Sequence, residues 1–175
     1  TELAFYSNAL DTKTSGFDLV ADYTMGSTNV GLALNHNETE VIGQNKVNGE
    51  DPVSQGTVDN LELNLPKDRI VTTVTHTFSD ALSAMVRINY YGESWDERGD
   101  YAAGTKDKIE AAMFMDVEVD YRISDNLSLV IGANNALNQF PTQIATRQGQ
   151  GMPYPRRSPL GYHGGMMFTR LTYNF

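Results

Sequence analysis

Three histidines are the residues of this sequence most able to bind a metal ion or to transfer a proton. His36, His76 and His163 lie far apart, and none has a partner at the spacing of a zinc site. This pattern favours solvated or interfacial histidines, and a site that converges only in three dimensions stays open. The sequence has no Ser–His–Asp order, glycine-rich phosphate loop or pair of acids suited to a hydrolase. We therefore predict no catalytic residue, no metal or cofactor, and no enzyme.

A row of carboxylates alternates with apolar residues between positions 109 and 123. Its members are Glu110, Asp116, Glu118 and Asp120. Carboxylate oxygens are ligands for Ca²⁺, so a calcium site is one interpretation. Alternation favours another, because alternate side chains of a strand share one face. We expect the four carboxylates to line a polar wall, where they could pair with arginines and lysines of another segment.

Arginines and aromatic residues near the C-terminus are the candidates for binding a ligand. Arg147, Arg156 and Arg157 form a basic cluster in an acidic chain, with Tyr154 and Tyr162 nearby. Guanidinium groups bind anions through paired hydrogen bonds, so this cluster predicts contact with an anionic ligand. Simple solvation of loop arginines is the alternative.

Trp95 marks a second aromatic group, together with Tyr90, Tyr91 and Tyr101. Rings of this kind gather at the two interfaces of a membrane, and they also stack on sugars or on aromatic ligands. We favour the membrane interface and keep Trp95 as a candidate ligand contact.

Composition limits what these residues can belong to. The 175 residues carry a net charge of −9, with pI ≈ 4.7, so nucleic acid is an unsuitable partner. The absence of cysteine excludes disulfides and Cys-based metal sites. No stretch approaches the roughly 18 consecutive apolar residues of a membrane helix. Since the lipid signal of a membrane β-barrel falls on alternate residues, that class stays open. No signal peptide is recognisable at the start of the sequence.

Alternation of apolar and polar residues dominates the chain and predicts the elements that position these groups. The alternating runs cover residues 16–25, 30–35, 69–78, 82–91, 109–123, 127–133 and 165–175. Strict alternation indicates strands with one apolar and one wet face, and about ten residues are enough to cross a bilayer when tilted. We therefore predict seven antiparallel strands.

The connections between these strands alternate in length. Short turns are predicted at 26–29, 79–81 and 124–126, and long polar loops at 43–68, 96–108 and 138–161. Short turns on one side and long loops on the other are typical of outer-membrane barrels.

Three stretches together resemble the TonB-dependent outer-membrane receptors. FYSNALDTKTSGFDLVADY (5–23) is similar to the entry into a late barrel strand. ISDNLSLVIGANNALNQFP (123–141) resembles the segment before the last long loop, and GGMMFTRLTYNF (164–175) resembles the final strand, which ends in phenylalanine.

The resemblance implies a fold and a function. Members of this family are 22-stranded barrels with an N-terminal plug, and they import ferric siderophores, haem, cobalamin or saccharides with energy from TonB. Residues 1–175 would then be the C-terminal, roughly seven-stranded part of such a barrel in a Gram-negative outer membrane, with the plug absent from this chain. The implied partners are outer-membrane lipid, the plug and remaining strands, TonB through the plug, and the barrel-assembly machinery through the strand ending in Phe175.

The stretch LVIGANNALNQFP (129–141) suggests how one strand leaves the hydrocarbon zone. We expect Asn134, Asn135 and Asn138 to satisfy backbone groups, and Pro141 to end the pairing. Phe140 would lie at the outer interface; the alternative folds it under the loop of a soluble sheet. Tyr173 and Phe175 are the other predicted interface aromatics.

Two other architectures stay open. A self-contained eight-stranded barrel, structural or adhesive, needs Thr1–Asn8 as an extra strand and DTKTSG (11–16) as a hairpin turn. A soluble β-sandwich is disfavoured by strand length and by the sorting of the loops.

Overall fold

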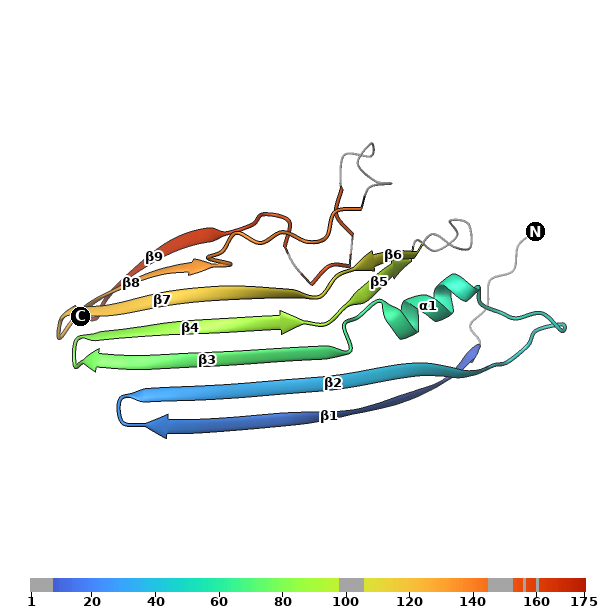
Figure 1. Ribbon diagram of the computed structural model, residues 1–175, viewed down its shortest axis with the longest axis horizontal. Coiled ribbons are helices and arrows are strands. Elements are labelled where there is room, and N and C mark those ends of the chain that lie inside the picture. The colour runs from blue at the N-terminus through green and yellow to red at the C-terminus, as the bar shows by residue number, and fades with distance from the viewer. Residues whose placement is uncertain (1–7, 98–105, 145–152, 156, 160) are drawn as a thin grey trace.

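Seven antiparallel strands form one continuous sheet in the computed structural model (Figure 1). The structure describes residues 8–97, 106–144, 153–155, 157–159 and 161–175. The sheet order is β1-β2-β3-β4-β7-β8-β9. The bounds are β1 Leu10–Met25, β2 Thr28–Gln44, β3 Asp68–Ser79, β4 Leu82–Tyr91, β7 Ala112–Ser124, β8 Leu127–Asn134 and β9 Met166–Tyr173. All seven predicted strands are therefore confirmed.

The loops are sorted by end, as predicted. Figure 1 shows the β1–β2, β3–β4 and β7–β8 turns together at one end, with the long connections at the other. Each turn spans two residues, at 26–27, 80–81 and 125–126. Gly26 has φ +56, a left-handed conformation that glycine adopts without the steric cost of a Cβ atom.

Three elements of the loop layer were not predicted. Helix α1 covers Gln55–Leu63 and begins at Ser54, whose Oγ accepts a hydrogen bond from Thr57 N at 3.3 Å. Strands β5 (Ser94–Glu97) and β6 (Lys106–Ile109) form a separate two-stranded ribbon beside α1 (Figure 1). The run predicted as one strand over 109–123 is thus divided at 110–111, and its first residue belongs to β6.

Register places most of the apolar side chains of the seven strands on one face, called here the apolar face. Val74 lies opposite Val30 and Val86, and Val86 lies opposite Val117, which continues the row. Most of these side chains are exposed; Leu19 is 49% and Leu171 64% exposed. The five buried apolar residues among those described lie elsewhere: Val58, Ile109, Phe114, Val130 and Ile144. Nothing in the described part of the chain covers the apolar face.

The apolar face ends at one level on adjacent strands. Along β2, the side chains on this face change from Val30, Leu32 and Leu34 to His36 and Glu38. Polar contacts gather here, since His36 Nδ1 lies 2.7 Å from Asp68 Oδ1 and Lys67 bonds Glu38. Up to this level, the apolar segments match the length at which a tilted strand crosses a bilayer. No helix among the described residues is long and apolar enough to cross a membrane.

The hairpin turn required by the eight-stranded alternative does not form. Residues 11–16 lie inside β1, which pairs with β2 from Leu10 to Met25 with one irregularity between Asp11 and Thr12. A Cβ atom at Gly16 would lie 2.2 Å from His36 O, so a glycine is needed where the two strands approach each other. Residues 1–7 of the proposed extra strand lie outside the described residues, whereas Asn8 precedes β1 without belonging to a strand.

Candidate functional site

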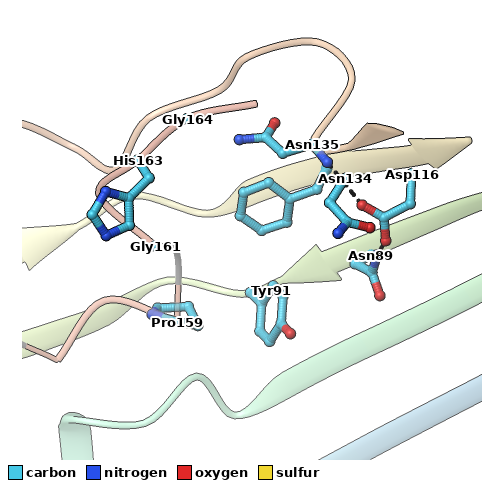
Figure 2. A pocket seen from close by; sticks show the side chains of 10 residues that line it. Asn89, Tyr91, Asp116, Asn134, Asn135, Pro159, Gly161, His163 and Gly164 are labelled. Atoms are coloured by element: carbon cyan, nitrogen blue, oxygen red, sulfur yellow. Dashed lines mark hydrogen bonds between the residues drawn. The ribbon is translucent and has the colours of Figure 1, made fainter. Parts of the chain in front are cut away.

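The polar face of the sheet is hollowed at its loop end. A cavity of about 310 Å³ lies there between the strands and Pro159, Gly161, His163 and Gly164 (Figure 2). Its lining residues are Asn89, Tyr91, Phe114, Asp116, Asn134, Asn135, Pro159, Gly161, His163 and Gly164. Strand parity explains this gathering, because Asn89 and Tyr91 of β4 share the polar face with Phe114 and Asp116 of β7.

Asp116 holds the floor of this cavity together. Its Oδ2 accepts a hydrogen bond from Asn89 Nδ2 at 3.0 Å, and its Oδ1 accepts one from the backbone N–H of Asn135 at 2.9 Å. Figure 2 shows both bonds converging on the carboxylate. One side chain thereby links β4, β7 and the turn after β8, so the cavity has a fixed floor.

Tyr91 separates this cavity from a second one of about 320 Å³. The guanidinium carbon of Arg69 lies 5.2 Å from the centre of the Tyr91 ring, and Phe114 meets that ring edge-on at 5.9 Å. The second cavity is lined by Asn35, Asn37, Thr39, Leu61, Glu62, Leu65, Pro66, Lys67, Arg69, Tyr91 and Pro159. Since Tyr91 and Pro159 line both cavities, we treat the two as one groove.

The asparagine-rich turn after β8 positions one end of the groove. Asn135 and Asn138 have φ values of 49 and 54, in the left-handed region that asparagine tolerates better than most residues. The Asn135 side chain donates to Gln139 O at 2.7 Å and accepts from Gln139 N at 2.9 Å. Asn138 Oδ1 accepts from Gly165 N at 2.9 Å. The predicted role of these two asparagines in satisfying backbone groups is confirmed, and Asn134 lines the groove.

Three aromatic rings stack beside this turn. Phe140 lies 6.2 Å from Tyr154, and Tyr154 lies 5.8 Å from Tyr162, with interplanar angles of 15° and 9°. Tyr162 Oη donates to Pro155 O at 2.7 Å, which holds the end of the stack. Phe140 lies at the loop end of the sheet, where its ring packs against a loop tyrosine and remains 44% exposed.

Two other predicted ligand contacts, Arg157 and Trp95, are described and do not belong to the groove lining. Arg157 is exposed and donates to Asn60 of α1. Trp95 is half-buried in β5, opposite Lys108. Arg147, Arg156 and Tyr101 lie outside the described residues. At the opposite end of the sheet, Tyr173 meets Phe175 edge-on at 5.1 Å.

The carboxylate row is confirmed for three of its members. Asp116, Glu118 and Asp120 share the polar face, and Glu118 Oε1 lies 4.0 Å from Arg170 Nη2 on the same face. The expectation for Glu110 was wrong, because it lies between β6 and β7, where its carboxylate is 3.4 Å from Lys108 Nζ.

The three histidines do not converge. His76 Nδ1 lies 2.7 Å from Thr28 Oγ1, His36 pairs with Asp68, and His163 lines the groove. Within the described ranges, no group of three His, Cys, Asp or Glu side chains is placed to hold a metal ion.

Composition and spacing did not indicate most of the groove residues. Asn89, Asn37 and Arg69 stood out neither by spacing nor by clustering, and Tyr91 was grouped with Tyr90. Parity was the available signal, because the two adjacent tyrosines point to opposite faces of β4 and only Tyr91 can reach the polar one.

Comparison with solved structures places this fold among known ones. Three similar structures are a ferripyoverdine receptor of the outer membrane of Pseudomonas aeruginosa, the ferric-catecholate import receptor Fiu of E. coli K12, and the copper transporter OprC. They are 18%, 15% and 16% identical to the chain, with TM-scores of 0.62, 0.63 and 0.62. The matches cover 94%, 93% and 95% of this chain and 20%, 21% and 23% of theirs.

These structures are all TonB-dependent outer-membrane receptors, so the resemblance seen in the sequence is confirmed at the level of the fold. The chain spans about a fifth of the length of the receptors that it matches. No model of a protein family matches the chain, and no curated protein is significantly similar to it.

Proposed function

We propose that this chain is the C-terminal part of the barrel wall of a receptor in the outer membrane of a Gram-negative bacterium. The receptor imports a scarce nutrient without changing it chemically, and TonB supplies the energy through a plug that residues 1–175 do not contain. The groove around Tyr91 lies at the loop end of the polar face, where a ligand arriving from outside would first meet the wall. The fold likeness to import receptors supports this assignment.

The observation that carries the proposal is the exposed apolar face, which ends at one level. An apolar surface formed by seven strands is unfavourable when it is exposed to water, so we expect an apolar medium to cover it. Lipid fits, because the apolar segments have the length of a bilayer crossing and the loops are sorted by end.

The two edges of the sheet support further proposed partners. β1 and β9 each have one paired neighbour among the described strands, so each leaves an open edge. We propose that the remaining strands of the barrel pair with both edges, and that the assembly machinery recognises the β9 end near Phe175.

The test is the intact mass of the native polypeptide, extracted from outer membranes and detected through an antibody to this segment. We expect a mass several times the 19.4 kDa of this chain. A mass near 19.4 kDa would overturn the proposal, because seven strands with two open edges cannot form a large import barrel.

A further inference from the structure

The groove around Tyr91 has the chemistry of a site for uncharged, hydroxyl-rich ligands. We infer that the ligand of this wall is an oligosaccharide rather than an anionic metal chelate. The inference rests on the proposed import function and adds to it the chemical class of the ligand.

Among the described residues that line the groove, the charges cancel. The described lining residues include two cations, Lys67 and Arg69, and two carboxylates, Glu62 and Asp116. An anionic ligand of high affinity needs an excess of positive charge, usually from arginines arranged for paired hydrogen bonds. The described lining residues do not supply that excess.

All four charged groups already contact the protein. Lys67 bonds Glu38, and Arg69 lies over the ring of Tyr91. Glu62 Oε1 accepts a hydrogen bond from Val41 N at 2.7 Å, and Asp116 accepts two hydrogen bonds on the floor of the groove. The charged groups therefore position the walls, and binding an anion would require some of these contacts to break.

Amide side chains are the most frequent polar groups of the lining. They are Asn35, Asn37, Asn89, Asn134 and Asn135, of which Asn35, Asn89 and Asn135 already bond Asp18, Asp116 and Gln139. An amide both donates and accepts hydrogen bonds, as a sugar hydroxyl does, so the two groups match without any charge. Asn37 and Asn134 are exposed, and each lines a different cavity of the groove. They offer hydrogen bonds to a ligand at both ends.

The shape and the apolar walls of the groove point to the same class. Leu61 is 44% and Leu65 72% exposed along the second cavity, where Pro66 adds a further apolar surface. Flat apolar surfaces next to hydrogen-bonding groups suit the C–H faces of sugar rings. The two cavities meet at Tyr91 and Pro159, so a ligand that fills both must be longer than one ring.

The experiment measures binding to the complete receptor in detergent by isothermal titration calorimetry. The probes are maltohexaose, xylohexaose, chitohexaose and their disaccharides, together with a ferric tris-catecholate as the anionic probe. We expect one hexasaccharide to bind, more tightly than its disaccharide. The variants Asn37→Ala and Asn134→Ala should each weaken binding by about three- to tenfold, because each loses a hydrogen bond to the ligand.

A matched control is Asn29→Ala, on the same face of the sheet but at the turn end, where Asn29 donates to Thr24 Oγ1 at 3.0 Å. This variant should leave the affinity unchanged. Binding of the catecholate alone, or of none of the probes, would overturn the saccharide inference and leave import standing. The proposed function fails separately, through an intact mass near 19.4 kDa.

Discussion

The ring of Phe168 in β9 lies across the bare backbone of Gly132 in β8, directly opposite in the register. A Cβ atom at Gly132 would lie 2.4 Å from Phe168 Cζ and 2.9 Å from Val117 O. Glycine is required at this position because the aromatic ring and the neighbouring strand both occupy the space of a side chain. The contact joins β7, β8 and β9 on the polar face.

Replacing Gly132 with alanine should destabilise the sheet by about 1–3 kcal/mol, because the added methyl displaces both the ring and the β7 carbonyl. Urea unfolding of the complete receptor in detergent measures the change. The matched control is Gly31→Ala, also on the polar face, where the new Cβ would meet only the flexible Asp22 Oδ1 at 3.0 Å and Thr73 O at 4.0 Å. Equal losses in the two variants would contradict the role of the Phe168 contact.

Asn135 combines a left-handed backbone with two side-chain hydrogen bonds to Gln139. Asn135→Gly should lose the hydrogen bonds but keep an allowed backbone, whereas Asn135→Ala should lose both. We therefore expect the alanine variant to be the less stable by about 1 kcal/mol, the cost of the left-handed conformation for a residue with a Cβ atom. Urea unfolding again decides, and a glycine variant as unstable as the alanine variant would show that backbone conformation is not the cause.

The sheet could be predicted because its signal is local. Each strand of the sheet has one apolar and one polar face, so its residues alternate between apolar and polar types along the sequence. In β4, Val86 and Ile88 point to the apolar face while Arg87 and Asn89 point away, and register then aligns these choices between strands. Turn residues at 79–81 and 124–126 indicated where one strand ends and the next begins.

The loop layer could not be predicted, because distant contacts decide it. Alternation continues through Ile109, Ala111 and Met113 without a break, yet the chain bends at 110–111. At this break Ile109 is 2% exposed, and Glu110 N donates a hydrogen bond to Thr142 Oγ1 at 3.1 Å. The local alternation of apolar and polar residues indicates neither of these two features.

The groove was hidden for a related reason. Its centre is Tyr91 held under Arg69, two residues that face each other only once β3 and β4 are in register. The arginines that the sequence suggested as ligand contacts are neighbours only along the chain. Arg157, the member of that cluster that the structure describes, donates a hydrogen bond to Asn60 of α1 and does not line the groove.

Lys108 offers a test in alkali, outside the spanning strands. Lys108 Nζ donates a hydrogen bond to Glu93 Oε2 at 2.9 Å, which raises the pKa of Lys108, and the nearby Glu110 adds to the rise. The stabilisation is therefore complete below the ordinary lysine pKa of about 10.4 and is lost as pH rises through the raised value. Lys108→Met removes it at every pH.

We expect the Tm of the wild-type receptor to exceed that of the Lys108→Met variant slightly at pH 8, and the difference to vanish as pH rises beyond about 10.4. Thermal unfolding followed by circular dichroism from pH 8 to alkaline pH measures it. The difference should also shrink in high salt, because the ion pairs are exposed. A constant difference at all pH values would mean that the methionine acts through packing and not through the lost charge.

The membrane assignment has a sharp test in two adjacent residues of β3. Val74 lies in the middle of the apolar face, and Thr75 points to the polar one. In lipid, Val74→Arg should cost about 2–4 kcal/mol, the penalty for an arginine at the bilayer midplane, while Thr75→Arg should cost little. The readouts are the free energy of unfolding from lipid vesicles and the fraction of receptor assembled in the outer membrane. Both substitutions introduce arginine, at neighbouring positions of the same strand. Any general effect of the added charge or of the strand propensity of arginine is therefore the same in both variants and does not contribute to the difference between them. Equal, small costs would show that the apolar face meets protein or water and not hydrocarbon, and the import proposal would lose the observation that carries it.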